Sequence, residues 1–78
     1  MSRYNGKALR RARIDLGVSQ ASLALIAGVE QTQVSQWERG TEPTGRNLVK
    51  LVDALRHVAA KAGRRAESYD ITMFYGGA

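Results

Sequence analysis

Residues 19–40, SQASLALIAGVEQTQVSQWERG, constrain the fold of this chain more than any other segment. Apolar residues recur with helical spacing on both sides of Gly28, which can adopt the positive φ of a tight turn. Ser19 is a suitable N-cap for the first helix, expected at Gln20–Ala27. A second helix is expected at Gln31–Arg39. The segment therefore predicts two short helices joined by a tight turn, the arrangement of a helix-turn-helix.

Helical spacing continues on both sides of this segment. A preceding helix is expected at Gly6–Leu16, where Leu9 and Ala12 fall on one face and Gly17 follows as a C-terminal glycine. A longer helix is expected to begin at Gly45 or Arg46, with Thr44 as a candidate cap, and to continue to about Ala62. Its apolar positions are Leu48, Leu51, Val52, Leu55, Val58 and Ala59.

The last segment lacks helical spacing. Aromatic, β-branched and other apolar residues alternate over residues 69–75, which predicts a β-strand. A lone strand leaves its backbone N–H and C=O groups without partners, so we expect it to pair antiparallel with the same strand of a second copy. The alternatives are a frayed tail or an extended segment packed on the preceding helix. The residues expected in this dimerisation element are Tyr69, Ile71, Met73, Phe74 and Tyr75.

These elements predict an all-α fold, a compact domain of four and at most five helices with a C-terminal strand that pairs across a dimer. Residues 1–62 are expected to form the helix-turn-helix domain and residues 63–78 the tail. With 78 residues the chain can build only one small core, so oligomerisation is a plausible source of added stability.

Basic residues flank residues 18–38, most of the helix-turn-helix, and do not lie within them. Residues 1–17 hold five basic residues and one acidic residue, and residues 39–65 hold seven basic and two acidic residues. Residues 18–38 hold two glutamates and no basic residue. This segregation fits a DNA partner, because flanking cations then hold phosphates and neutral polar groups read bases.

The second helix of the pair has two different faces. Val34 and Trp37 are expected to pack against the preceding helix, whereas the opposite face is polar. Glutamine can bond to two atoms of adenine, and threonine can pack its methyl group on that of thymine. Each polar residue alone would suit a solvated surface, but the set favours base reading. The candidates for base contacts are Gln31, Thr32 and Gln36, followed by Gln33 and Ser35.

Contacts to the DNA backbone are expected around this helix. Gln20 lies at a helix N-terminus, which favours anions, and Arg46 is placed to reach the adjacent minor groove. The alternative for each cation is plain solvent exposure, which carries most weight for Lys50. The candidates for backbone and minor-groove contacts are Gln20, Arg10, Arg39, Arg46 and Lys50.

Two charged residues fall on otherwise apolar helix faces. Arg13 lies on the inner face of the first helix and Glu38 on that of the third. Because a buried unpaired charge is costly, each is expected to pair with the other in a structural ion pair.

Three runs, LRRARIDLGVSQ, LALIAGV and VSQWERGTEPTGRNLVKLVDAL, resemble the lambda-like phage repressor family of helix-turn-helix domains over about Ala8–Leu55. The resemblance implies a lambda-repressor-like DNA-binding domain. It implies base contacts at the positions of Gln31, Thr32 and Gln36. It also implies that Gln20 orients the first reading residue, that Arg46 approaches the minor groove, and that Arg13 and Glu38 form a core ion pair.

The chain departs from the family pattern in two places. Glu30 stands where serine or threonine usually caps the recognition helix, although its carboxylate still favours that helix end. The usual fifth helix after Leu55 is not evident. The usual dimer contact of the family therefore cannot be transferred to this chain.

We expect a transcriptional regulator of phage or other prokaryotic origin, a Cro-like or controller-like repressor that binds a palindromic DNA operator as a homodimer. The alternative is an antitoxin of a toxin–antitoxin pair. Some antitoxins join such a domain to a C-terminal strand and bind a toxin protein as well as DNA. Co-purification of a second polypeptide would discriminate the two.

Catalysis is not expected. His57 is the only histidine, cysteine is absent, and no glycine-rich phosphate loop occurs, so we expect no enzyme, catalytic residue, cofactor or metal. No apolar run is long enough to span a membrane, and the lack of cysteine fits a cytoplasmic location.

Overall fold

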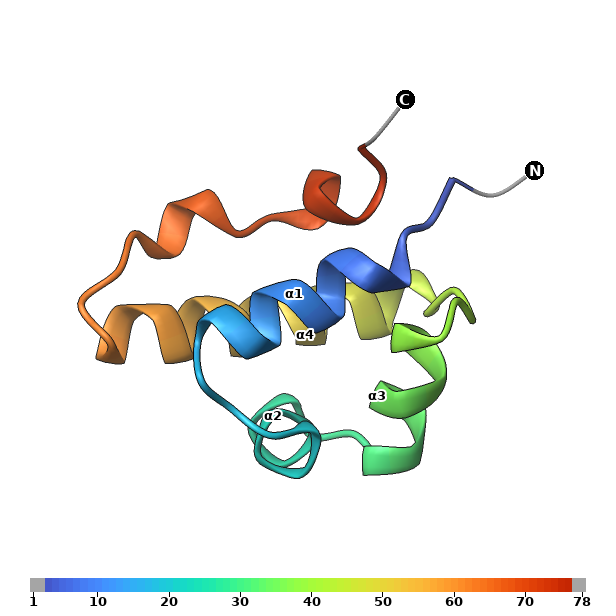
Figure 1. Cartoon of the computed structure of the whole chain (residues 1–78), viewed down its shortest axis with the longest axis horizontal. Coiled ribbons are helices and arrows are strands. Elements are labelled where there is room, and N and C mark those ends of the chain that lie inside the picture. The colour runs from blue at the N-terminus through green and yellow to red at the C-terminus, as the bar shows by residue number, and fades with distance from the viewer. Residues whose placement is uncertain (1–2, 77–78) are drawn as a thin grey trace.

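The computed structural model describes residues 3–76, and within them it contains α-helices and 3-10 helices but no strand (Figure 1). The four predicted helices are present, and three of them end one residue earlier than expected. The all-α prediction is therefore confirmed. The elements are α1 (Gly6–Asp15), α2 (Gln20–Ala27), α3 (Gln31–Glu38), α4 (Gly45–Lys61), η1 (Ala66–Ser68) and η2 (Ile71–Phe74).

The predicted caps and turn glycine set these boundaries. The hydroxyl of Ser19 accepts a hydrogen bond from the Ser22 N–H at 3.0 Å, and that of Thr44 accepts from the Asn47 N–H at 3.3 Å. Gly28 ends α2 with a φ of 74°, which an L-residue rarely adopts. Local chemistry thus explains where α2 begins and ends and where α4 begins.

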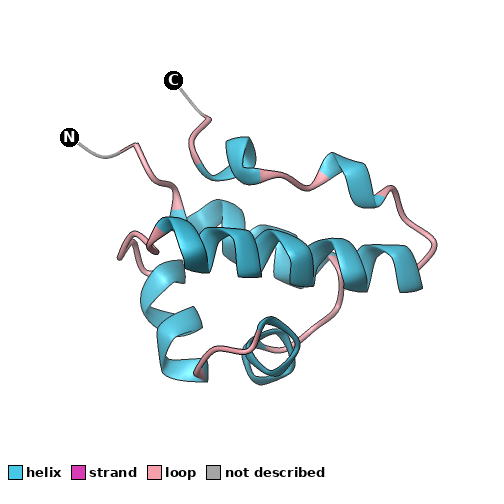
Figure 2. Ribbon diagram, turned by 180° about the vertical axis from the view of Figure 1, so that it is seen from behind, coloured by secondary structure: helices cyan, strands magenta, loops and turns pink. Residues whose placement is uncertain are grey.

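The core is shared by all four α-helices and the C-terminal segment. In Figure 1, α1 passes in front of α4, with α2 and α3 on one side of the two helices and the chain after α4 on the other, and Figure 2 shows the same arrangement from behind. The largest fully buried side chains are Phe74, Leu9, Leu23, Leu51, Leu55 and Val34.

The N-terminal end of α1 packs closely on the C-terminal end of α3. A Cβ atom on Gly6 would lie 2.3 Å from the carbonyl oxygen of Trp37 and 2.8 Å from that of Glu38, so no side chain fits there. The Tyr4 hydroxyl donates a hydrogen bond to the same Trp37 oxygen at 2.8 Å. The positive end of the α1 dipole therefore faces the carbonyls that end α3.

The predicted strand at residues 69–75 is wrong. The segment contains the 3-10 helix η2, and the Asp70 carboxylate caps it by accepting a hydrogen bond from the Thr72 N–H at 2.8 Å. In a strand, Phe74 would lie on the other face from Tyr69 and Tyr75. In the structure it is fully buried in the core of the same subunit. Intrachain packing overrides the β-propensity of this segment.

The backbone of the tail finds partners within the chain. The Phe74 carbonyl oxygen accepts a hydrogen bond from the Asn5 N–H at 2.7 Å, and the Tyr69 carbonyl oxygen accepts one from Arg56 Nε at 2.6 Å. The argument that a second copy must satisfy these groups therefore fails, and with it the assignment of 69–75 as an intersubunit strand.

Aromatic contacts complete the attachment of the tail. The ring of Tyr4 lies 6.2 Å from that of Phe74 and 6.0 Å from that of Tyr75, measured between centroids. The Tyr75 hydroxyl donates to the carboxylate of Glu42 in the loop before α4. The described tail, residues 63–76, thus packs on the helical domain. The predicted domain 1–62 and tail 63–78 also include residues 1–2 and 77–78, which lie outside the described part.

Candidate nucleic-acid interface

Helix α3 is anchored by its inner face. Val34 is fully buried and Trp37 nearly so, and both join the cluster formed by Leu23, Ala24 and Ala27 of α2. The small alanine side chains allow the two short helices to approach closely. The inner face therefore holds α3 in a fixed position on the domain.

The outer face of α3 is polar and solvent-exposed. Gln31, Thr32 and Gln36 are exposed, and Ser35 is half-buried. Thr32 and Gln36 are one helical turn apart, and Gln31 is the first residue of the helix. The structure thus places the first-rank candidates for base contacts together, at the N-terminal end and outer face of one helix.

Gln33 has a structural task in addition to its predicted one. Its side-chain oxygen accepts a hydrogen bond from the Glu30 N–H at 3.0 Å, which is one half of a capping box. This bond reinforces the N-terminus of α3, where the sequence has Glu30 in place of the usual serine or threonine. The Gln33 oxygen is therefore engaged within the helix, which leaves the amide nitrogen as the group for other partners.

Arg13 and Glu38 form the predicted pair. Arg13 Nε lies 2.6 Å from Glu38 Oε2, and Arg13 Nη2 lies 3.1 Å from Glu38 Oε1, a bidentate geometry. Arg13 Nη1 also donates to the carbonyl oxygen of Val18 at 3.0 Å. The pair ties α1 to the C-terminal end of α3 and to the loop before α2.

Gln20 belongs to this network. Its Nε2 donates to Glu38 Oε1 at 3.0 Å, so Glu38 links α1, α2 and α3. Burial would raise the pKa of Glu38, but the hydrogen bonds from Arg13 and Gln20 outweigh it and the pKa lies below its ordinary value. The Gln20 nitrogen is therefore engaged inside the protein, which the sequence prediction of a DNA-backbone contact did not foresee.

The predicted cationic contacts separate into two groups. Arg39 and Arg46 are exposed and border the loop that joins α3 to α4, next to the candidate reading helix. Arg10 is exposed on α1, close enough to Glu38 to lower its pKa, whereas Lys50 is half-buried in a depression between α2 and α4. The structure therefore places Arg39 and Arg46 as an exposed pair of cations on either side of the α3–α4 loop.

Other kinds of site find no support in the described residues. No group of three or more His, Asp or Glu side chains within residues 3–76 lies close enough to hold a metal ion. No helix in that part of the chain is long and apolar enough to cross a membrane.

Comparison with known proteins agrees with this geometry. A helix-turn-helix family model matches residues 9–60, which include all four α-helices in whole or in large part. The chain belongs to the helix-turn-helix family. The matched region contains both the α2–α3 pair and the cationic start of α4.

Two curated relatives also match this helix-turn-helix chain, and together with the family model they confirm the family resemblance seen in the sequence. Repressor protein C2 of Salmonella phage P22 and the HTH-type transcriptional regulator DicA of Escherichia coli (strain K12) are each 44% identical over 52 residues, 65% of this chain. The match spans only 24% of the phage protein and 38% of the bacterial one. No solved structure gives a significant match.

Two local features of this helix-turn-helix domain were missed by sequence reasoning, although signals for them were present. Asn5, a preferred N-cap residue directly before α1, accepts a hydrogen bond from the Lys7 N–H at 3.0 Å. Gln33 stands three residues after Glu30, the spacing of a capping box. The role of Gln20 had no such signal, because it depends on how three helices meet.

Proposed function

We propose that the chain is a sequence-specific transcriptional regulator that binds double-stranded DNA and represses by occupying a promoter. The observation that carries the proposal is the two-faced helix α3. Val34 and Trp37 fix its inner face, whereas Gln31, Thr32 and Gln36 stand exposed on a surface without charge of its own. The printed names of the two relatives, a repressor and a transcriptional regulator, support it.

Base recognition is assigned to the outer face of α3. The major groove admits an α-helix, whose N-terminal residues meet the base edges first. The amides of Gln31 and Gln36 suit the N6/N7 edge of adenine, and Thr32 suits a thymine methyl group. Ser35 and the remaining amide nitrogen of Gln33 are second-rank readers.

Phosphate contacts are assigned chiefly to Arg39 and Arg46. Arg39 directly follows α3 and Arg46 lies in the first turn of α4, so cations at both ends of the connecting loop would position the helix without reading sequence. Gln20, Arg10 and Lys50 keep a lesser part, because other groups of the protein engage or surround each of them. Gln20 would act mainly by holding the α2–α3 unit together.

Specificity requires more than one copy of α3. A single helix reads only a few base pairs, and a symmetric dimer doubles the site by binding half-sites about 34 Å apart. The proposed operator is therefore palindromic and the proposed binding species a homodimer. The antitoxin alternative relied on a C-terminal strand, and residues 3–76 contain none.

Selection from random double-stranded DNA tests the proposal. The purified protein should enrich a consensus with dyad symmetry, and its affinity should fall as salt rises. Arg39→Gln and Arg46→Gln should each reduce the slope of log K against log salt by about 0.9. Arg64→Gln is the matched control, since Arg64 follows the end of α4 that lies away from α3 (Figure 1). Failure to enrich any sequence would overturn the proposal.

A further inference from the structure

The outer side of α4 carries a stripe of four solvent-exposed residues. Val49, Asp53, Arg56 and Ala60 follow one another at steps of four, three and four residues, which places them on one line along the helix. Val49 keeps 49% of its surface exposed. We refer to these four residues as the α4 stripe.

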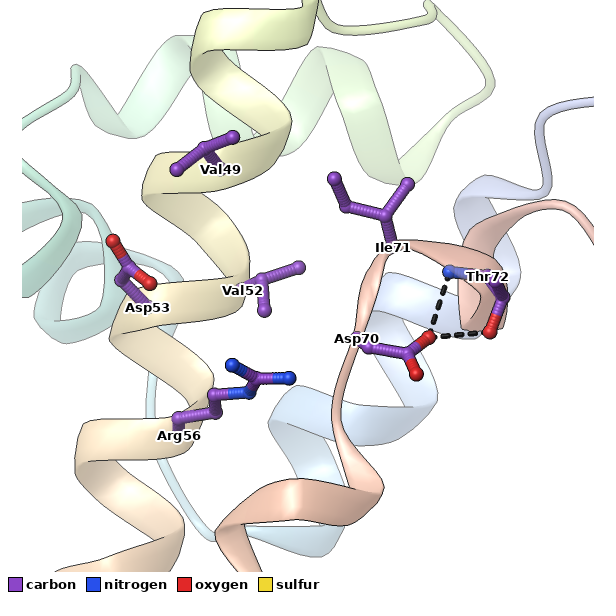
Figure 3. Close-up of a pocket in the computed structure, with 7 residues that line it drawn as sticks. All are labelled: Val49, Val52, Asp53, Arg56, Asp70, Ile71 and Thr72. Atoms are coloured by element: carbon purple, nitrogen blue, oxygen red, sulfur yellow. Dashed lines mark hydrogen bonds between the residues drawn. The ribbon is translucent and has the colours of Figure 1, made fainter.

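Apolar walls border the α4 stripe on both sides. Ile71 of η2 is 39% exposed across a depression of about 370 Å³, and Figure 3 shows it opposite Val49 and Val52. On the other side, Ile26 of α2 is 43% exposed and borders a second depression that also reaches Asp53. Exposed aliphatic side chains around a shallow groove are suited to receive a helix.

The charges of the α4 stripe are complementary to themselves. If two copies of α4 cross antiparallel about a two-fold axis midway between positions 53 and 56, Asp53 of each copy lies opposite the partner's Arg56. Val49 then lies opposite the partner's Ala60, whose small side chain permits close approach. A parallel pairing in register would instead oppose like charges.

We infer that the α4 stripe is the surface at which two copies of this chain pair, α4 against α4, as an isologous dimer. Each dimer would hold two Asp53–Arg56 ion pairs at the centre, with Val49 and Ala60 at both ends and the isoleucine walls around them. Arg56 is already held toward the tail by its bond to the Tyr69 carbonyl oxygen. The inference rests on the proposed homodimer and names its contact surface.

Cysteine cross-linking tests the register, because the chain has no cysteine of its own. A mixture of Val49→Cys and Ala60→Cys should form a disulfide-linked pair under mild oxidation, since the two positions face each other. Val49→Cys alone should not cross-link to itself, because the two copies of position 49 lie about 16 Å apart along the antiparallel axes. Self-linking as fast as in the mixture would overturn the register.

Charge reversal tests the pairing by sedimentation without DNA. Asp53→Arg alone and Arg56→Asp alone should each oppose like charges and weaken dimerisation at least about tenfold. An equimolar mixture of the two variants should associate again, because every pair across the axis is then attractive. Asp15→Arg, which makes the same charge change at an exposed position on α1, is the matched control and should dimerise like the wild type.

A wild type that sediments only at the 8.5 kDa of one chain would overturn the inference, as would dimers of Asp53→Arg as stable as those of Asp15→Arg. Neither result decides whether the protein binds DNA, so the two proposals can be tested independently. A monomer that still enriches a DNA sequence would refute the α4 surface alone, whereas a dimer that enriches none would refute the DNA function alone.

Discussion

Glu38 connects three helices through one carboxylate. It accepts hydrogen bonds from Arg13 of α1 and Gln20 of α2, and its side chain is only 4% exposed. We expect Glu38→Ala to lower the free energy of unfolding by about 3–5 kcal/mol, because the Arg13 charge then stays in a largely closed site without its partner. Urea or thermal unfolding followed by circular dichroism measures this.

The control for this variant is Glu67→Ala, which removes an exposed carboxylate and should change stability by less than about 0.5 kcal/mol. If Glu38→Ala melts like the wild type, the network has no structural role and Glu38 would have to be reconsidered as a DNA-facing residue.

Stability should fall in acid because of the same carboxyl group. Its pKa in the folded protein lies below the ordinary value of 4.5, so the protonated form is disfavoured by folding. The stabilisation is fully present above the unfolded pKa and is lost as the pH falls through the lower folded pKa. Below about pH 5, we expect the urea midpoint of the wild type to fall more steeply with decreasing pH than that of Glu38→Gln, whose amide cannot titrate. Equal pH dependence in the two proteins would contradict this.

Two helix-initial glycines differ in what surrounds them, and they provide a matched pair of variants. Gly6 begins α1 against the Trp37 carbonyl oxygen, whereas Gly45 begins α4 in open space. Gly6→Ala should destabilise the domain by more than about 1 kcal/mol, since α1 and α3 must move apart. Gly45→Ala should be neutral or stabilising by up to about 1 kcal/mol, because alanine favours helix. Equal melting temperatures of the two variants would refute the close α1–α3 contact.

The C-terminal segment should act as part of the fold of one subunit. Phe74 is fully buried and its carbonyl oxygen is bonded to Asn5. Phe74→Ala should therefore cost about 3–5 kcal/mol of stability, as large-to-small changes in cores do. Ile14→Ala is the control, because Ile14 is 52% exposed. Native stability of Phe74→Ala in denaturant unfolding would show that the tail is not a core element.

The helices and the tail differ in how far sequence determines them. Helices α1 to α4 follow from apolar spacing, from Ser19 and Thr44 as caps, and from Gly28 at the turn, all of which are local signals. The segment 69–75 has the alternation of a strand, and only the cavity that receives Phe74 gives it another conformation. That cavity is made by residues far away in the chain, so local pattern could not reveal it.

One part of the candidate interface could be predicted from the sequence and another could not. The exposure of Gln31, Thr32 and Gln36 follows from helical periodicity, because the spacing that places Val34 and Trp37 on the inner face places these residues on the outer one. The engagement of Gln20 with Glu38 was not predictable, since it requires the relative positions of α2 and α3. Long polar side chains have several partners within reach, and only the tertiary structure selects among them.

The molecule as a whole combines basic flanking segments with the uncharged polar face Gln31, Thr32 and Gln36 of α3, the proposed reading helix. Its net charge of +5 comes from the segments before and after the α2–α3 pair, which itself holds no basic residue through position 38. This distribution suits a protein that is attracted to DNA by its flanks and discriminates sequence with α3. The α4 stripe would add the second copy that a palindromic operator requires.

The most direct test of this account is DNA selection carried out in parallel with the wild type and Gln36→Ala. Gln36 is exposed, so the variant should fold and melt like the wild type. The account predicts that the Gln36→Ala consensus loses its preference at the same base pair in each half-site, about 1–3 kcal/mol of discrimination, and keeps the remainder. Identical consensus sequences from the two proteins would contradict the claim that the outer face of α3 reads DNA.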